Sequence, residues 1–331
     1  MATLWAKKKS WEDRKFPPYE LMETARVSDS QEKYRRLENL YHKTQAQSWD
    51  GRELLQKLLD KHGGIHIPPA KRKAISEVFA IILWGELAAW QVSAELSEKI
   101  PDVEARMAAT GQVFDEARHF YTMRDYLLAL GGEAPRINWF TKKVLDYLLH
   151  TDNLVYKLVG MQLLVENIAV HIFKKMAEAG VEPVLTELMP YFERDEARHV
   201  GLGVMYLPVL LQELSATEQA RLAAFQAYVY VMIVLGGYSL MPEFRELGIN
   251  VNQWLRRMGR DHADIAFRMG RYQDRKGVLV MPKWLHKIDK FMIDLFVPPD
   301  PANASAPVRM LNTVLEKATA GIARVADRLA L

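Results

Sequence analysis

The chain has 331 residues, of which 49% are hydrophobic and 26% are charged. This composition supplies enough apolar surface for a sizeable core and excludes a chain that is disordered throughout. Forty-four Lys and Arg against 41 Asp and Glu leave a formal net charge of +3, so we expect no dedicated nucleic-acid surface. The absence of cysteine excludes disulfides, thiolate catalysis and metal sites that need a thiolate ligand.

The N-terminal stretch lacks the apolar segment of a signal peptide, and we therefore expect a cytoplasmic protein. Residues 222–241 are long and apolar enough to be considered as a membrane span. Within them, Gln226, three tyrosines and a Gly-Gly pair favour a buried helix of a bundle instead. We expect no membrane contact.

Apolar residues recur at helical spacing along most of the chain, and glycines and prolines separate the helical segments. The expected helices cover residues 31–42, 51–62, 71–99, 103–130, 141–150, 153–179, 185–214, 215–238 and 250–270. Only residues 277–281 have the composition of a short strand. The predicted fold class is therefore all-α.

Three regions follow from this pattern. Residues 1–70 form an N-terminal arm and short helices, residues 71–272 form the main helical bundle, and residues 273–331 form a C-terminal region with a linker. In this last region, 283–296 and 308–331 have the pattern of amphipathic helices. We expect them to pack on the bundle or on a second copy in a homodimer, rather than on a membrane surface.

The sequence Asp-Glu-Ala-Arg-His occurs twice, at residues 115–119 and 195–199, with an offset of 80 residues. A Glu and a His three residues apart lie on the same face of a helix, so both can bind one metal ion. One such pair is weak support for a metal site, but an identical repeat is much stronger.

The repeat extends to two further glutamates. Glu86 and Glu166 differ by the same offset, and each lies 30 residues before the Glu of its repeated motif. A turn lies midway between the two glutamates of each pair, about 22 Å along either helix from each of them. Two antiparallel hairpins packed together would therefore bring six side chains to the middle of a four-helix bundle: Glu86, Glu116, His119, Glu166, Glu196 and His199.

Four carboxylates in an apolar core repel one another, and two divalent cations would cancel their charge. Carboxylates with one imidazole for each metal suit iron or manganese better than zinc or copper. The alternative is that the repeated motifs are solvated local charge networks. Glu86 and Glu166 lie in apolar helices without a nearby basic partner on their own faces, which argues against this alternative.

One Glu on each of two helices and Glu-x-x-His on each of two others is the signature of ferritin-like di-iron carboxylate proteins. Over about residues 30–240 the chain resembles the larger branch of this superfamily, which includes ribonucleotide reductase small subunits, bacterial di-iron monooxygenases and acyl-carrier-protein desaturases. The resemblance implies a ferritin-like bundle with two metal ions, either Fe/Fe or Mn/Fe. It also implies that four charged residues orient the two histidines: Asp115, Arg118, Asp195 and Arg198.

The segment 43–55 is similar to one in the reductase small subunits, which makes Trp49 a candidate electron-relay residue, with core packing as the alternative. Glu193 could add a carboxylate near the second metal, or it could be solvated. Reductase small subunits carry a radical tyrosine where this chain has Met123, and the monooxygenases carry a threonine where it has Val170. These departures favour a different member of the superfamily.

The leading hypothesis is an oxygen-activating dinuclear oxidase or oxygenase that acts on an organic, apolar substrate. Because no flavin or nicotinamide motif occurs, an external protein would supply the electrons. The alternatives are a radical-generating subunit and a non-enzymatic iron storage or scavenging protein. The residues near the site that suggest an apolar pocket are Leu83, Trp90, Val113, Leu163, Val170 and Phe192, with Gln112 and Gln162 as polar exceptions. For most of them individually, packing in the core of the bundle is the favoured alternative.

Overall fold

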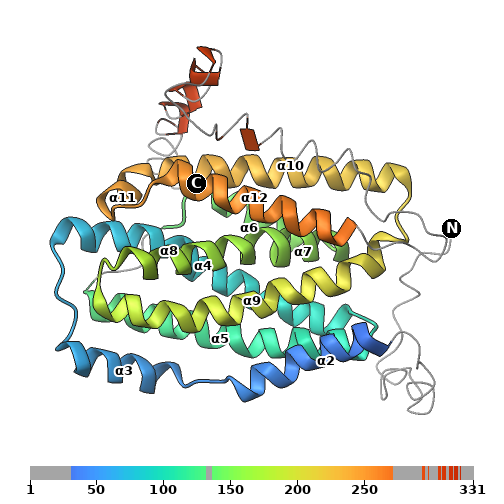
Figure 1. Ribbon diagram of the computed structural model, residues 1–331, viewed down its shortest axis with the longest axis horizontal. Coiled ribbons are helices and arrows are strands. Elements are labelled where there is room, and N and C mark those ends of the chain that lie inside the picture. The colour runs from blue at the N-terminus through green and yellow to red at the C-terminus, as the bar shows by residue number, and fades with distance from the viewer. Residues whose placement is uncertain are drawn as a thin grey trace.

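The computed structural model describes residues 31–131 and 136–270, together with separate positions between 293 and 321. Every regular element of residues 31–131 and 136–270 is a helix, as Figure 1 shows, so the predicted all-α class is confirmed. The predicted arm 1–20 and strand 277–281 lie outside the described residues. The same holds for most of the predicted helices 283–296 and 308–331.

The helices follow the predicted order with small differences at their ends. They are α2 (Gln31–Ala46), α3 (Gly51–His62), α4 (Pro69–Lys99), α5 (Val103–Leu130), α6 (Trp139–His150), α7 (Leu154–Leu158), the π-helix η2 (Val159–Val165), α8 (Glu166–Ala179), α9 (Pro183–Leu211), α10 (Ala216–Ser239), α11 (Met241–Glu246) and α12 (Val251–Gly270).

Two antiparallel hairpins form the central four-helix bundle. One hairpin pairs α4 with α5, and the other pairs the η2–α8 helix with α9. Helices α2 and α3 contact α5 and α9, whereas α6, α10, α11 and α12 contact the bundle from another side (Figure 1). This is the ferritin-like arrangement that the sequence predicts, with further helices added to the bundle.

The hydrophobic core consists of two clusters that follow one another along the bundle. On α4, the first cluster includes residues up to Leu83 and the second begins at Ala88. On α9, the first cluster includes residues up to Phe192, and the second begins at Leu202. The six predicted ligand residues lie between these two apolar clusters, in a layer shielded from solvent at both ends.

Proline and capping residues determine where the helices begin. Pro69 and Pro183 occupy the start of α4 and α9, where a missing N–H removes no intrahelical bond. These helices therefore begin two residues before the predicted starts. Asp50 caps α3 by accepting hydrogen bonds from two backbone N–H groups at 2.9 Å, and Ser215 forms a capping box with Glu218 at the start of α10.

Two local features were not predicted. The six-residue helix α11 follows α10 after Leu240, and residues 159–165 form a π-helix within the predicted helix 153–179. Apolar periodicity does not separate a short π segment from an α-helix. Close packing is a feature of this segment, since a Cβ atom at Gly160 would lie 2.3 Å from Leu148 and 3.1 Å from Phe225.

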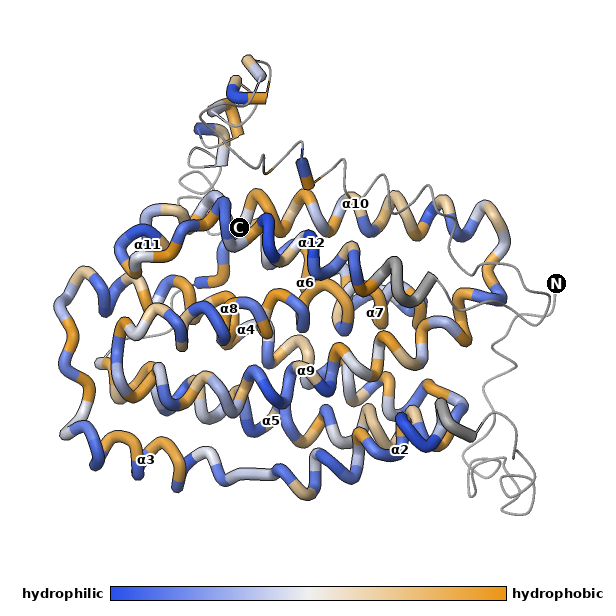
Figure 2. Tube along the Cα trace, viewed as in Figure 1, coloured by the Kyte–Doolittle hydropathy of each residue, from blue (hydrophilic) through white to orange (hydrophobic). Residues whose placement is uncertain are grey.

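Within the residues that the structure describes, three helical stretches could cross a membrane by length and composition alone: Pro69–Lys99, Leu154–Ala179 and Ala216–Ser239. In the protein, 61%, 72% and 50% of their most apolar windows are buried. The first two stretches carry Glu86 and Glu166 and belong to the central bundle. The third is α10, in which no charged residue follows Arg221; Figure 2 shows mainly apolar residues along this part of the helix.

Candidate dinuclear metal centre

The six predicted ligand residues come together at the middle of the bundle. Glu86 lies on α4, Glu116 and His119 lie on α5, Glu166 begins α8, and Glu196 and His199 lie on α9. All six side chains are at most 4% exposed. The spacing argument from the two hairpins therefore gives the correct location for each of them.

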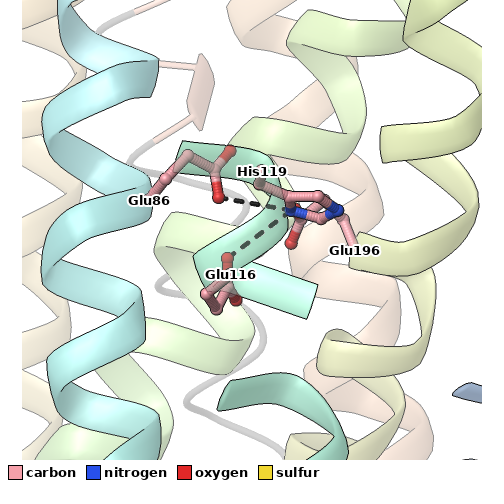
Figure 3. Close-up of side chains that lie close together, drawn as sticks. All are labelled: Glu86, Glu116, His119 and Glu196. Atoms are coloured by element: carbon pink, nitrogen blue, oxygen red, sulfur yellow. Dashed lines mark ion pairs between the residues drawn. The ribbon is translucent and has the colours of Figure 1, made fainter. Parts of the chain in front are cut away.

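These residues form two groups that share two glutamates. The first group, called site A, contains Glu86, Glu116, His119 and Glu196, which are shown in Figure 3. The second group, called site B, contains Glu116, Glu166, Glu196 and His199. Within each group the possible ligand atoms lie within 4.8 Å of one another, so each group has the donor atoms to hold one metal ion.

The two shared glutamates direct one oxygen toward each site. Glu116 Oε1 lies 3.0 Å from His199 Nδ1 in site B, and Glu116 Oε2 lies 3.6 Å from His119 Nδ1 in site A. Glu196 Oε1 lies 2.9 Å from His119 Nδ1, and Glu196 Oε2 lies 2.8 Å from His199 Nδ1. Glu116 and Glu196 are therefore placed to bridge two cations.

Unsatisfied polar atoms show that the cluster suits cations. Glu116 Oε2, His119 Nδ1 and Glu196 Oε1 are buried and lie close to one another, but their contacts do not have hydrogen-bond geometry. An unpaired buried polar group is costly, and these three atoms all belong to site A. Oxygen donors with one nitrogen for each ion, and no sulfur, fit iron or manganese. Two divalent cations would balance the four carboxylates.

Burial and mutual repulsion alter the acidity of the metal-free cluster. Burial, together with the carboxylates of Glu196 and Glu116, raises the pKa of Glu86 and of Glu166 well above its ordinary value. Burial by itself would lower the pKa of His119 and His199, but the neighbouring carboxylates outweigh it and raise both values. Without metal, protons therefore take over part of the charge balance, and cations would displace them on binding.

The two histidines are held by aspartates from the opposite repeat. His119 Nε2 lies 3.2 Å from Asp195, and His199 Nε2 lies 3.3 Å from Asp115. Each contact leaves the Nδ1 atom facing the cluster, which is the orientation that metal binding needs. The aspartates thus lie where the resemblance places them, but each holds the histidine of the other motif.

Two arginines complete this outer layer. Arg118 donates hydrogen bonds to both Asp115 and Asp195, and Arg198 does the same at 2.9 and 2.6 Å. All four side chains are buried. Because every charge has two partners of opposite sign, the quartet fixes both aspartates and, through them, both imidazole rings.

Trp49 joins this layer, whereas Glu193 does not. The indole Nε1 of Trp49 donates a hydrogen bond to Asp195 at 2.7 Å, and Arg118 lies 4.7 Å from the centre of its ring. The contact continues from Asp195 to His119, so Trp49 lies on a hydrogen-bonded path to the cluster. Glu193 is partly exposed and belongs to neither site A nor site B.

The residues that suggested an apolar pocket do not line one, which agrees with the core packing favoured for most of them individually. A cavity of about 80 Å³ contacts Glu86 and Glu166, but none of these eight residues lines it. Leu83, Leu163 and Phe192 pack in the core instead, and Trp90 is 37% exposed. The prediction followed the ligand helices one turn up and down, whereas the cavity lies between these helices and α6, α10, α11 and α12.

Small residues beside the ligands are the sequence signal that would have located the cavity. Gly85, Ala89 and Ala169 lie next to or one turn from Glu86 and Glu166, and they leave room for the cavity. Further lining comes from larger apolar side chains on the outer helices, among them Val144, Leu145, Ile233, Leu240, Phe244 and Trp254. The surroundings of the two glutamates are therefore strongly apolar.

Comparison with known proteins supports the fold. No family model and no curated protein matches the chain. Among solved structures, "Protein 19 with aldehyde deformylating oxidase activity from Synechococcus" is 18% identical with a TM-score of 0.55, over 68% of this chain and 97% of that one. A variant of an R2-like ligand-binding oxidase with an aerobically reconstituted Mn/Fe cofactor is 16% identical with a TM-score of 0.43, over 78% and 92% of the two chains.

Proposed function

We propose that this protein is an oxygen-dependent oxidase or oxygenase with a dinuclear metal cofactor, Fe/Fe or Mn/Fe, and an apolar organic substrate. The observation that carries the proposal is the contact between the two-site cluster and the apolar cavity through Glu86 and Glu166. A substrate in this cavity would lie directly beside the candidate ligands. The solved structure reported above with a TM-score of 0.55 is described as having aldehyde deformylating oxidase activity, which supports this proposal.

A redox-active pair of metal ions would supply electrons for the reduction of O2, which amino-acid side chains alone do not provide. The chain contributes the ligands Glu86, Glu116, His119, Glu166, Glu196 and His199. Its aspartate and arginine quartet fixes both imidazoles. The two apolar core clusters exclude water around the cluster, which strengthens electrostatic interactions there and protects reactive groups from side reactions.

The substrate class follows from the lining of the cavity. Apart from the two glutamates, the residues around it are almost all aliphatic, aromatic or glycine. Burying apolar surface contributes about 25 cal/mol for each Å², so an apolar compound gains most from entering. An external electron donor belongs to this proposal, because substrate oxygenation consumes electrons that must return to the metals.

The proposal is tested by reconstitution with Fe(II), alone or with Mn(II), without oxygen. Oxygen labelled with ¹⁸O is then added together with a chemical reductant and a panel of linear and aromatic hydrocarbons, alcohols and aldehydes. We expect oxygen consumption that depends on metal and substrate, and oxidised products that mass spectrometry detects. Two metals bound without any metal-dependent oxidation of the panel would contradict the oxidase proposal.

The two alternative functions give different results in the same preparation. A radical-generating subunit would show a long-lived organic radical by EPR after exposure to oxygen. An iron-storage protein would take up many irons for each chain and form a shell-like oligomer, whereas we expect a homodimer in sedimentation.

A further inference from the structure

The internal repeat allows the surroundings of the two cation sites to be compared position by position. Gln162 lies four residues before Glu166, and the matching position before Glu86 is Ile82. Gln112 lies four residues before Glu116, and the matching position before Glu196 is Phe192. Each half of the repeat thus places one amide near the cluster where the other half places an apolar side chain.

The amide of Gln112 contacts site B. Its Nε2 donates hydrogen bonds to Glu116 Oε1 at 2.9 Å and to Glu166 Oε1 at 2.7 Å. Glu116 Oε1 is the oxygen that faces His199. Both acceptors of Gln112 therefore belong to residues of site B, and the bonds hold the two carboxylates at a fixed separation.

Gln162 fixes the orientation of this amide. When cations are bound, the carboxylates are ionised and can only accept hydrogen bonds, so the NH2 group of Gln112 must face them and its oxygen must face away. That oxygen accepts a hydrogen bond from Gln162 Nε2 at 3.2 Å. Both glutamines are at most 1% exposed, and water does not compete for these bonds.

Site A has a different environment. Its atoms Glu116 Oε2, His119 Nδ1 and Glu196 Oε1 face one another, and no described side chain outside the cluster donates a hydrogen bond to them. Ile82 and Phe192 are buried in the apolar core, and the ring centre of Phe192 lies 4.5 Å from that of His119. No amide occupies the corresponding positions to hold the carboxylates of this site.

We propose that Gln112, oriented by Gln162, is a positioning residue for site B only, and that the two cation sites are therefore unequal although their ligand types are the same. This inference rests on the proposed function in one respect, namely that the cluster binds two cations. Partners that hold metal ligands in place affect metal affinity by about 10–100-fold when they are removed. In this protein, removal of the Gln112 amide should lower metal affinity at site B and leave site A unchanged, although the two sites share Glu116 and Glu196.

The test uses Mn(II) as the probe, added to the metal-free full chain without oxygen. Calorimetric titration measures the two binding steps, and anomalous diffraction at the manganese edge measures the occupancy of each site. Gln112→Met removes the amide but keeps the length of the side chain. Ile82→Met is the matched control for Gln162→Met, because residue 82 is the equivalent of residue 162 in the internal repeat and lies beside site A.

We expect the wild type to bind two Mn(II) ions and Gln112→Met to lose about 10–100-fold in affinity at site B only. Gln162→Met should show a smaller loss at the same site, because it acts through Gln112. Ile82→Met should bind like the wild type. Circular dichroism shows whether Gln112→Met folds. If it does not, Gln162→Met replaces it in the test: loss of occupancy at site B supports the inference, and loss at site A contradicts it.

Two other results overturn the inference and differ in what else they exclude. Equal loss at both sites, or no loss at either site, would contradict the role of Gln112 and leave the dinuclear centre intact. A wild type that binds no cation would contradict the proposed function and this inference together.

Discussion

The carboxylate of Asp115 lies 3.3 Å from Nε2 of His199, a residue 84 positions away on another helix. Asp195 has the reciprocal contact with His119, at 3.2 Å. Each aspartate directly precedes a shared glutamate and lies on the same helix as the histidine of its own motif. It nevertheless contacts the histidine of the other motif. The two halves of the bundle are therefore locked to each other at the level of the candidate ligands, as well as through their apolar packing.

This crossing predicts where a mutation acts. Asp115→Asn replaces a charged acceptor by a neutral one, so the preferred tautomer of His199 is less well fixed. We expect about 10–100-fold weaker cation binding at site B. Asp195→Asn should have the same effect at site A. Site-resolved occupancy by anomalous diffraction measures both, and each variant is the control for the other. A loss centred on the site of the same helix would contradict the crossed arrangement.

The shared glutamates give a second prediction. Glu116→Ala and Glu196→Ala each remove one ligand from both sites, so either variant should lose tight binding of both cations. The helices should remain, because apolar packing on either side of the cluster is unchanged. Metal analysis and circular dichroism check these two expectations.

Glu193→Ala is the matched control for the variants of the shared glutamates, since Glu193 lies one turn from Glu196 but outside both sites. It should keep the metal content of the wild type. Undiminished metal in the Glu116→Ala/Glu196→Ala double variant would mean that the ligands are wrongly assigned.

The sequence predicted the fold and the meeting of the six ligand residues because both follow from periodicity. Helical spacing locates the hairpins, and a repeat with equal distances to each turn brings Glu86 level with Glu116. The crossed contacts of Asp115 and Asp195 could not be predicted in this way. They depend on the rotation of each helix about its axis, which the packing of all neighbouring helices determines.

The cavity escaped prediction for a related reason. Its walls come from helices that are far apart in the sequence, and its volume depends on where small residues of one helix meet those of another. Gly85 and Gly236 are more than 150 residues apart but line the same space. The π-helix before Glu166 was also missed, because Val159–Val165 has the composition of any buried helix.

Gly85 provides a direct test of the cavity as the substrate site. It is a helical residue beside Glu86, and a Cβ atom there would meet no other atom within 4 Å. Gly85→Leu should therefore fill part of the cavity without steric conflict and leave metal binding unchanged. We expect it to lose oxidation of the apolar compound that the wild type oxidises fastest.

Gly85→Ala is the matched control for this experiment. It should retain activity and stabilise α4 by about 0.5–1 kcal/mol, since glycine is unfavourable inside a helix. Thermal unfolding and product formation are measured for both variants with equal metal content. Oxidation at the wild-type rate by Gly85→Leu would show that the substrate binds elsewhere.

A buried lysine outside the cluster predicts how stability changes with pH. Lys157 is 1% exposed, and its Nζ contacts Glu95 at 3.0 Å and donates a hydrogen bond to the carbonyl oxygen of Leu148, near the end of α6, at 2.9 Å. Burial raises the pKa of Glu95, but hydrogen bonds from Lys99 and Lys157 outweigh it, so the pKa lies below its ordinary value of 4.5. A carboxylate with a lowered pKa stabilises the fold above the unfolded-state pKa, and this contribution is lost as the pH falls through the folded-state value.

Glu95→Gln should therefore cost about 2 kcal/mol at neutral pH, because it leaves the buried ammonium of Lys157 without its charged partner. The difference in unfolding free energy between wild type and variant should stay constant down to about pH 5 and shrink below it. Urea unfolding at a series of pH values measures this difference. Glu246→Gln, at an exposed position of α11, is the control and should show no such dependence. A difference between wild type and Glu95→Gln that persists or grows in acid would show that Glu95 acts through packing rather than through its charge.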